Sequence, residues 1–154
     1  MAKLAYKLVF PLALISFVLI TKWWFAVPVD APGTYFIGFP FPYACDGWHT
    51  SLSIQFFLME LVVDFLVYYF AWFIFVFLIN KFIKPIKINK AVFLTLLSLN
   101  ILILTPTIYF FTNSNNIIYL RRPFEIAIFE TGFKFIWQND KEINYEFYQF
   151  KQKN

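Results

Sequence analysis

Two carboxylates, Glu60 and Asp64, stand four positions apart in an otherwise apolar stretch of the chain. Residues at this spacing share one face of a helix, and Ser53 and Tyr68 extend the same stripe. Ionisable groups inside a membrane are costly, so each is a functional hypothesis by default. The chemistry that they suggest is a proton or cation relay facing other helices, in this chain or in a partner subunit.

The depth of these carboxylates favours a simpler role. With a rise of about 1.5 Å per residue and a hydrocarbon core about 30 Å thick, counting from Asn80 places Glu60 at the outer headgroups and Asp64 about 6 Å inside the core. We therefore expect Asp64 to be hydrogen-bonded to a tyrosine, a tryptophan or Asn100, or to be paired with Lys22. Pairing with another subunit stays open, as does the relay, although the cytoplasmic half of the helix offers a relay only aromatic residues with polar edges.

Cys45, Asp46 and His49 form a second group of candidates, because all three residue types bind metal ions. Their spacing matches no strong metal-site pattern, and the chain has 1 Cys and 1 His. Even with Glu60 as a further oxygen ligand, a buried thiol beside a surface histidine is the interpretation that we favour. A Cys–His catalytic pair in such a loop would lack an orienting scaffold, and we expect neither a metal nor a cofactor.

Other chemistry finds no support in the sequence. The chain contains no glycine-rich phosphate loop and neither a His-Glu-x-x-His nor a Gly-x-Ser-x-Gly motif. The net charge is +4, but the basic residues are scattered and no RNA-binding aromatic pattern accompanies them. We therefore predict that the protein is not an enzyme and has no nucleic-acid partner.

The composition indicates that a membrane holds these residues. Of the 154 residues, 60% are hydrophobic, 24% are aromatic and only 14% are charged, and a soluble chain this short could not bury so much apolar surface. Runs long enough to cross a bilayer occupy 8–26, 54–79 and 91–111. No small-residue cleavage site follows the first run, so we interpret it as a retained helix. The prediction is a membrane α-helical fold with three transmembrane helices in residues 1–112.

The lysines set the expected orientation. The loop 80–90 contains no acid and four lysines, which marks it as cytoplasmic; these are Lys81, Lys84, Lys87 and Lys90. Lys3 and Lys7 then lie on the same side, and Arg121-Arg122 is the one opposing signal. We expect a bacterial plasma (inner) membrane, with the N-terminus cytoplasmic and the tail 113–154 extracytoplasmic.

The outer loop 27–50 and the tail are also rich in aromatic residues, but these do not belong to a membrane helix. Proline and glycine forbid a continuous helix in the loop, which we expect to fold back along the membrane surface as an aromatic extracytoplasmic loop. In the tail, apolar and polar residues alternate over 124–128, 133–137 and 143–148, which predicts a small C-terminal antiparallel β-meander with turns at Thr131-Gly132 and Asn139-Asp140. A fourth strand could lie at 117–120.

One aromatic face of so small a sheet must rest on the outer loop, the bilayer surface or another protein. The partner-facing candidates are Phe39, Phe41, Tyr43, Trp48, Phe133, Phe135 and Trp137.

The string from Tyr35 to Tyr43 reads Tyr-Phe-Ile-Gly-Phe-Pro-Phe-Pro-Tyr and precedes a long aromatic helix. Over about residues 5–80 this pattern resembles small uncharacterised bacterial multi-pass membrane proteins with a Gly-Phe-Pro-Phe-type outer loop. The resemblance implies a membrane location and no particular activity.

Three helices are too few for a transporter, which normally uses internal repeats around a midplane site. We therefore favour a non-enzymatic accessory or structural subunit of a larger inner-membrane complex, whose partners are the lipid bilayer and other membrane subunits. Asn100 would contribute to helix packing by a hydrogen bond across to another helix. The alternatives are a toxin-immunity or other outer-leaflet binding protein, and a proton or cation relay subunit that uses Glu60 and Asp64.

Overall fold

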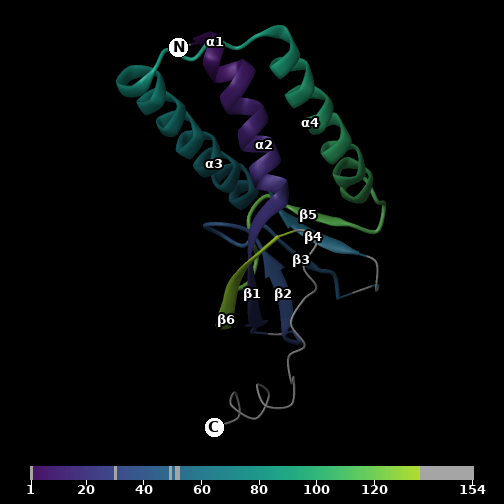
Figure 1. Ribbon diagram of the computed structural model, residues 1–154. Helices are drawn as coiled ribbons and strands as arrows, with labels where there is room; N and C mark the ends of the chain where they lie inside the picture. The colour runs from purple at the N-terminus through teal and green to yellow at the C-terminus, as the bar shows by residue number, and fades with distance from the viewer. Residues whose placement is uncertain (1, 30, 49, 51–52, 136–154) are drawn as a thin grey trace.

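The computed structural model describes residues 2–29, 31–48, 50 and 53–135, and these form a helical end and a sheet end (Figure 1). Three helical stretches, Ala2–Leu19, Leu58–Ile83 and Lys90–Phe111, are long and apolar enough to cross a membrane. They comprise α1 (Ala2–Leu4), η1 (Ala5–Val9), α2 (Phe10–Leu19), α3 (Leu58–Leu78), η2 (Ile79–Ile83) and α4 (Lys90–Phe111). At about 1.5 Å per residue their lengths are roughly 27, 39 and 33 Å, close to or above the thickness of a hydrocarbon core.

All the strands belong to one six-stranded sheet with the order β5-β4-β3-β2-β1-β6. Neighbours pair antiparallel except β4 and β5, which are parallel. The longest pairing joins β1 to β6, from Ile20 opposite Phe135 to Pro28 opposite Ile126. The strands are β1 (Ile20–Pro28), β2 (Thr34–Ile37), β3 (Ala44–Asp46), β4 (Ile54–Phe57), β5 (Ile117–Tyr119) and β6 (Ile126–Phe135).

The main cluster of buried side chains lies on one face of this sheet, and the sheet is at the end of the molecule away from the loop that follows η2 (Figure 1). Phe124, in the link between β5 and β6, packs against Phe36 with ring centroids 6.3 Å apart and against Phe57 at 5.8 Å. Alternation along each strand turns every second side chain toward this face. The core residues are Ala26, Phe36, Cys45 and Phe57, with Trp24, Tyr119, Phe124 and Ile126 packed around them.

Two helices join the sheet without a connecting loop. The last residue of α2, Leu19, precedes the first residue of β1, Ile20, which already has extended angles of φ −123° and ψ 117°. Similarly, Phe57 ends β4 at φ −116° and ψ 102°, and Leu58 begins α3. The sheet is therefore joined directly to two of the three candidate membrane helices.

Two predicted helices are displaced along the chain, because the helical stretches are Ala2–Leu19 and Leu58–Ile83. The helix predicted over 8–26 ends at Leu19, and the helix predicted over 54–79 begins at Leu58. The residues outside them form β1 and β4, because this β-branched and aromatic sequence exchanges intrahelical hydrogen bonds for pairing with other strands. The third helix, predicted over 91–111, runs from Lys90 to Phe111, as expected within one residue.

The outer loop and the tail differ more from the prediction. The loop 27–50, in which no strand was predicted, supplies the end of β1 and all of β2 and β3 to the sheet. The predicted turn at Thr131-Gly132 is wrong, because these residues continue β6 and pair with Trp24 and Trp23 of β1.

A strand at 117–119 falls within the fourth strand that the tail suggested. However, β5 and β6 lie at opposite edges of the sheet, so they do not form a meander by themselves. The predicted strand 143–148 and the turn at Asn139-Asp140 lie outside the described residues.

Candidate functional site

A polar stripe runs along one face of α3, and each of its members bonds to a different part of the chain. Glu60, Asp64, Tyr68 and Trp72 follow one another at four-residue spacing, which keeps them on one side of the helix. Their partners are, in order, the link between β5 and β6, the loop between β2 and β3, the first residue of β1, and α2. We call these four residues the α3 stripe.

Asp64 is fully buried, with 0% of its surface exposed. Its Oδ1 accepts a hydrogen bond from the backbone N–H of Phe41 at 2.9 Å. The partner is thus a main-chain amide and not the tyrosine, tryptophan, Asn100 or Lys22 that the sequence suggested. Lys22 instead places its Nζ 3.6 Å from the centre of the Trp24 ring, an arrangement typical of a cation–π interaction.

Ser53 does not belong to the stripe, contrary to the prediction, because it precedes β4 and is not helical. Its hydroxyl donates to the carbonyl of Thr50 at 2.9 Å.

The loop that Asp64 holds is fixed at several other points. The Gly38 N–H donates to the Lys22 carbonyl at 2.9 Å, and the Gly38 carbonyl accepts from Trp24 Nε1 at 2.8 Å. Gly38 has φ +146°, and a Cβ there would meet the Phe41 carbonyl and the Tyr43 backbone. Glycine is therefore required at this position. The peptide bond that follows, Phe39–Pro40, is cis.

Tyr43 brings a phenol to the same junction between the helices and the sheet. Burial raises the pKa of Tyr43, nearby Asp64 and Tyr68 raise it further, and a hydrogen bond with the Thr21 side chain opposes them. Phe17 of α2 stacks on the Tyr43 ring at 5.2 Å and meets Tyr68 edge-on at 5.7 Å. The carboxylate of Asp64 is thus enclosed by phenols and aromatic rings.

Glu60 holds the segment between β5 and β6. Its Oε1 accepts from the backbone N–H of Arg122 at 3.3 Å, and the neighbouring Met59 N–H donates to the Leu120 carbonyl at 3.0 Å. The guanidinium of Arg122 in turn donates through Nε to the Phe124 carbonyl at 3.0 Å. No pattern in the sequence indicated this role for Arg122, which is 62 positions from Glu60 and entered the prediction only as a topology signal.

The other two bonds of the stripe tie α3 to α2 and to the start of the sheet. The Tyr68 hydroxyl donates to the carbonyl of Ile20 at 2.7 Å, and Trp72 Nε1 donates to Ser16 Oγ at 2.8 Å. Neither Ser16 nor Trp72 was a predicted site residue. A four-residue spacing counted onward from Asp64 does reach Trp72, but it does not identify the partner.

Each of the two carboxylates in the α3 stripe has one oxygen without a hydrogen bond among the described residues. Asp64 Oδ2 and Glu60 Oε2 are buried and have no hydrogen-bond partner in the described part of the chain. Cavities of about 760, 230 and 420 Å³ lie near residues 79–87, 71–75 and 109–113, and neither Glu60 nor Asp64 lines them. One oxygen of each carboxylate accepts from a main-chain amide, and none of these three cavities brings a substrate to them.

Asn100, the remaining polar candidate in a helix, is 6% exposed. Its Nδ2 donates to the carbonyl of Leu96 at 2.7 Å, one turn earlier in the same helix. The side chain of Asn100 therefore bonds within α4 and not, as predicted, across to another helix. A side chain of this kind can reach the carbonyl four residues earlier in its own helix.

The metal candidates do not converge. Cys45 and Asp46 are neighbours in β3, so their side chains leave opposite faces of the sheet, with Cys45 buried and Asp46 exposed. Burial raises the pKa of the Cys45 thiol to about 12, and the charge of Asp46 adds to the effect. His49 lies outside the described residues, among which no three His, Cys, Asp or Glu side chains form a metal-binding group.

Some of the partner-facing aromatic residues pack inside the chain. Phe39 contacts Phe133 at 5.2 Å, and Trp48 contacts Phe124 at 5.1 Å, between ring centroids. Phe41 and Phe133 keep 52% and 62% of their surfaces exposed. Part of the tail's aromatic face thus rests on the outer loop. The Phe135 side chain and Trp137 lie outside the described side chains.

The predicted topology-setting lysines lie in η2, at the start of α4 and in the loop between them, and this segment is at the other end of the helices, near the N-terminus (Figure 1). Lys81, Lys84, Lys87 and Lys90 are all exposed. Comparison of the whole chain with known protein families, with characterised proteins and with solved structures finds no match.

Proposed function

We propose that this chain is a non-enzymatic accessory or structural subunit of a bacterial plasma-membrane complex, with its helices in the bilayer and its sheet on the extracytoplasmic side. The observation that carries the proposal is the bonding of the α3 stripe. Glu60, Asp64, Tyr68 and Trp72 each bond to another segment of the same chain. The polar groups that would otherwise suggest catalysis or transport therefore hold the sheet on the helices.

The same bonding favours a structural role over an ion relay. A relay needs polar groups that are free to exchange a proton or an ion along the membrane normal. From Phe73 to Leu78, the end of α3 beyond Trp72, every side chain is hydrocarbon. The stripe thus stops part of the way along the helix.

The surface of α4 favours docking of another membrane helix. This helix contacts η1 and α2 but leans away from α3 (Figure 1), and Leu102 and Tyr109 keep 70% and 76% of their surfaces exposed. Its hydroxyl groups bond to carbonyls of their own helix and so leave an apolar surface; they belong to Thr95, Ser98, Thr105 and Thr107. Small side chains of this kind are common where membrane helices pack closely.

The distribution of lysines supports the orientation. Six lysines lie in the N-terminal segment and in the η2–α4 loop, and no acid occurs between Asp64 and Glu125 or before Asp30. Such an excess marks the cytoplasmic side of a membrane protein. The sheet, at the opposite ends of the helices, would then face the periplasm or the cell exterior.

Crosslinking tests the subunit proposal. A photoreactive amino acid at Leu102 of α4 should crosslink to one defined membrane protein in intact cells, and the same complex should appear at fixed stoichiometry by native mass spectrometry. The matched control is Ile74 of α3, also apolar and exposed at 56%. A monodisperse monomer, together with crosslinks at both positions to lipid alone, would refute the proposal.

Cysteine labelling tests the orientation. Cys45 is buried, so it should not react in the folded protein. A single cysteine is introduced at Lys87 or at Val29, which is exposed at 70%, and its reactivity shows on which side of the membrane that position lies. A membrane-impermeant maleimide added to whole cells should label the cysteine at Val29 and spare the cysteine at Lys87. The opposite pattern would reverse the proposed topology.

A further inference from the structure

We propose that the loop between η2 and α4 binds the phosphate headgroup of an anionic phospholipid, with Lys84 and Lys87 as the charged groups that hold it. The proposal rests on the membrane placement proposed above. It assigns a ligand site to the end of the molecule whose lysines were used above only to predict the orientation in the membrane.

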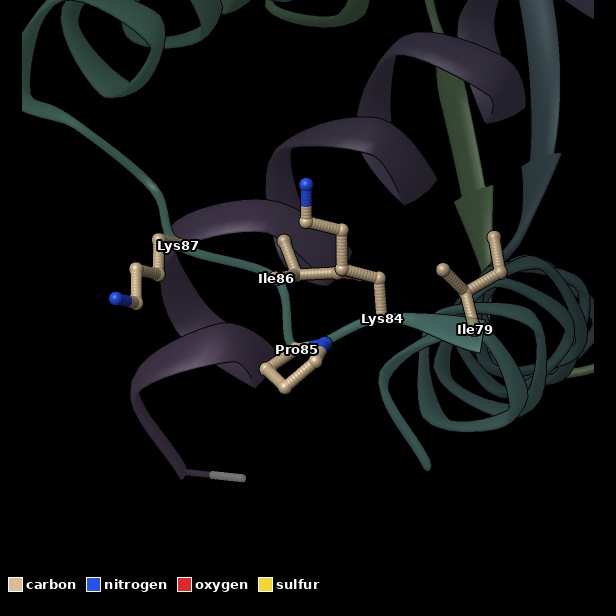
Figure 2. Close-up of a pocket in the computed structure, with 5 residues that line it drawn as sticks. All are labelled: Ile79, Lys84, Pro85, Ile86 and Lys87. Carbon is tan, nitrogen blue, oxygen red and sulfur yellow. The ribbon is translucent and has the colours of Figure 1, made fainter. Parts of the chain in front are cut away.

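An open hollow lies in this loop. Its volume is about 760 Å³, and it is lined by Ile79, Lys84, Pro85, Ile86 and Lys87. Figure 2 shows the Lys84 side chain between Ile79 and Ile86, and the Lys87 amine directed away from Ile79. Two lysines and three apolar residues thus line one hollow, and the two amines point in different directions, so a headgroup would be held by flexible side chains at its rim.

The backbone of the loop is fixed by hydrogen bonds. The Asn80 side chain accepts from the Ile86 N–H at 2.9 Å, and the Lys84 N–H donates to the Ile79 carbonyl at 3.0 Å. Asn89 caps α4 by accepting from the Val92 N–H at 2.9 Å. Ordering the loop therefore takes little of the binding free energy, because the cavity is formed before a ligand arrives.

No carboxylate of the described residues serves as a counter-ion at this end. Glu60 and Asp64 lie in the first two turns of α3, and Asp46, Glu125 and Glu130 lie in or beside the strands. The lysines of the loop are joined by Lys7, whose Nζ lies 5.5 Å from the centre of the Phe93 ring. The excess positive charge is thus complementary to an anion from outside the chain.

The surroundings of the cavity favour a lipid over a free anion. Phe82 and Ile83, just before Lys84, keep 70% and 79% of their surfaces exposed, and they are the last residues of the candidate membrane helix Leu58–Ile83. Basic pockets at the cytoplasmic ends of membrane helices are typical sites for anionic headgroups. The apolar walls formed by Ile79 and Ile86 can contact the glycerol and the first acyl carbons, which free phosphate lacks.

Lipid titration of the full chain tests the site. The protein is purified in a neutral detergent, titrated with phosphatidylglycerol or with phosphatidylcholine, and its 1:1 lipid adduct is measured by native mass spectrometry. Two double variants with the same loss of charge are compared, K84Q/K87Q in the cavity and K3Q/K90Q outside it. Work at moderate salt limits the contribution of distant lysines, because the Debye length at 0.15 M is about 8 Å.

We expect a phosphatidylglycerol adduct and a much weaker phosphatidylcholine adduct. At about 1 kcal/mol for each lysine near an anionic headgroup, K84Q/K87Q should weaken phosphatidylglycerol binding on the order of 30-fold, and K3Q/K90Q by less than about threefold. Inorganic phosphate in millimolar excess should not displace the lipid.

Equal weakening by the two double variants, no weakening by K84Q/K87Q, or displacement by inorganic phosphate would each overturn the lipid site. Retention of both variants in the membrane after an alkaline wash tests the membrane placement separately. A protein that fails the wash refutes the proposed function, whereas one that passes it without binding lipid refutes only this site.

Discussion

Replacing Asp64 by alanine or asparagine separates the hydrogen bond of this residue from its charge. Asp64→Ala removes the acceptor of the Phe41 N–H, a bond of 2.9 Å made by a side chain with no exposed surface. An unsatisfied buried donor costs about 1–3 kcal/mol. Asp64→Asn removes the charge but keeps a carbonyl oxygen for the same N–H. We therefore expect the alanine variant to be less stable than the asparagine variant by about 1–3 kcal/mol, or roughly 5- to 150-fold in the unfolding equilibrium.

The assay is reversible unfolding in mixed micelles, followed by tryptophan fluorescence. Trp24 is a suitable reporter because its Nε1 bonds to the carbonyl of Gly38, in the loop that Asp64 holds. Equal destabilisation by the two variants would show that the charge matters and the hydrogen bond does not. A cell phenotype that Asp64→Asn abolishes while the protein stays folded would refute the structural role and support an ion relay.

Three further predictions use the same unfolding assay or its samples. Gly38→Ala should cost more than about 1 kcal/mol, because alanine is strained at φ +146°, and wild-type stability would contradict the loop geometry. Cys45 should resist maleimide at pH 8 until the protein unfolds. The pKa of its thiol is about 12 in the folded protein and 9.0 ordinarily, so its contribution to the free energy of unfolding is complete below pH 9 and is lost as the pH rises toward 12. Cys45→Ala should remove that part of the pH dependence, and an unchanged profile would exclude it. A double-mutant cycle of Ser16→Ala with Trp72→Phe should give a coupling of about 0.6 kcal/mol between α2 and α3, and zero coupling would show that their 2.8 Å contact contributes nothing.

The sequence predicted the three helices because long apolar runs are typical of helices that could cross a membrane. It failed at their ends nearest the sheet. Residues 20–28 and 54–57 are apolar and lie next to helical runs, and an apolar run does not by its period distinguish a buried strand from a helix. Only pairing with β2, β3, β5 and β6, which are far along the chain, decides that these residues are extended.

Prediction of the candidate site was limited in the same way. Four-residue spacing placed Glu60, Asp64 and Tyr68 on one face of a helix, and the structure has them there. Their partners are backbone groups of Arg122, Phe41 and Ile20. Every residue has a backbone amide and carbonyl, so residue type gives no signal for such a partner.

The direct passage of α2 into β1 and of β4 into α3 couples the direction of these helices to that of the sheet. No hinge residue separates Leu19 from Ile20 or Phe57 from Leu58, and the α3 stripe braces the joint from the side. Membrane helices adjust to bilayer thickness by tilting. With the helices in a bilayer, as proposed above, a tilt of these two helices would also turn the sheet, so the orientation of the sheet would depend on the thickness of the membrane.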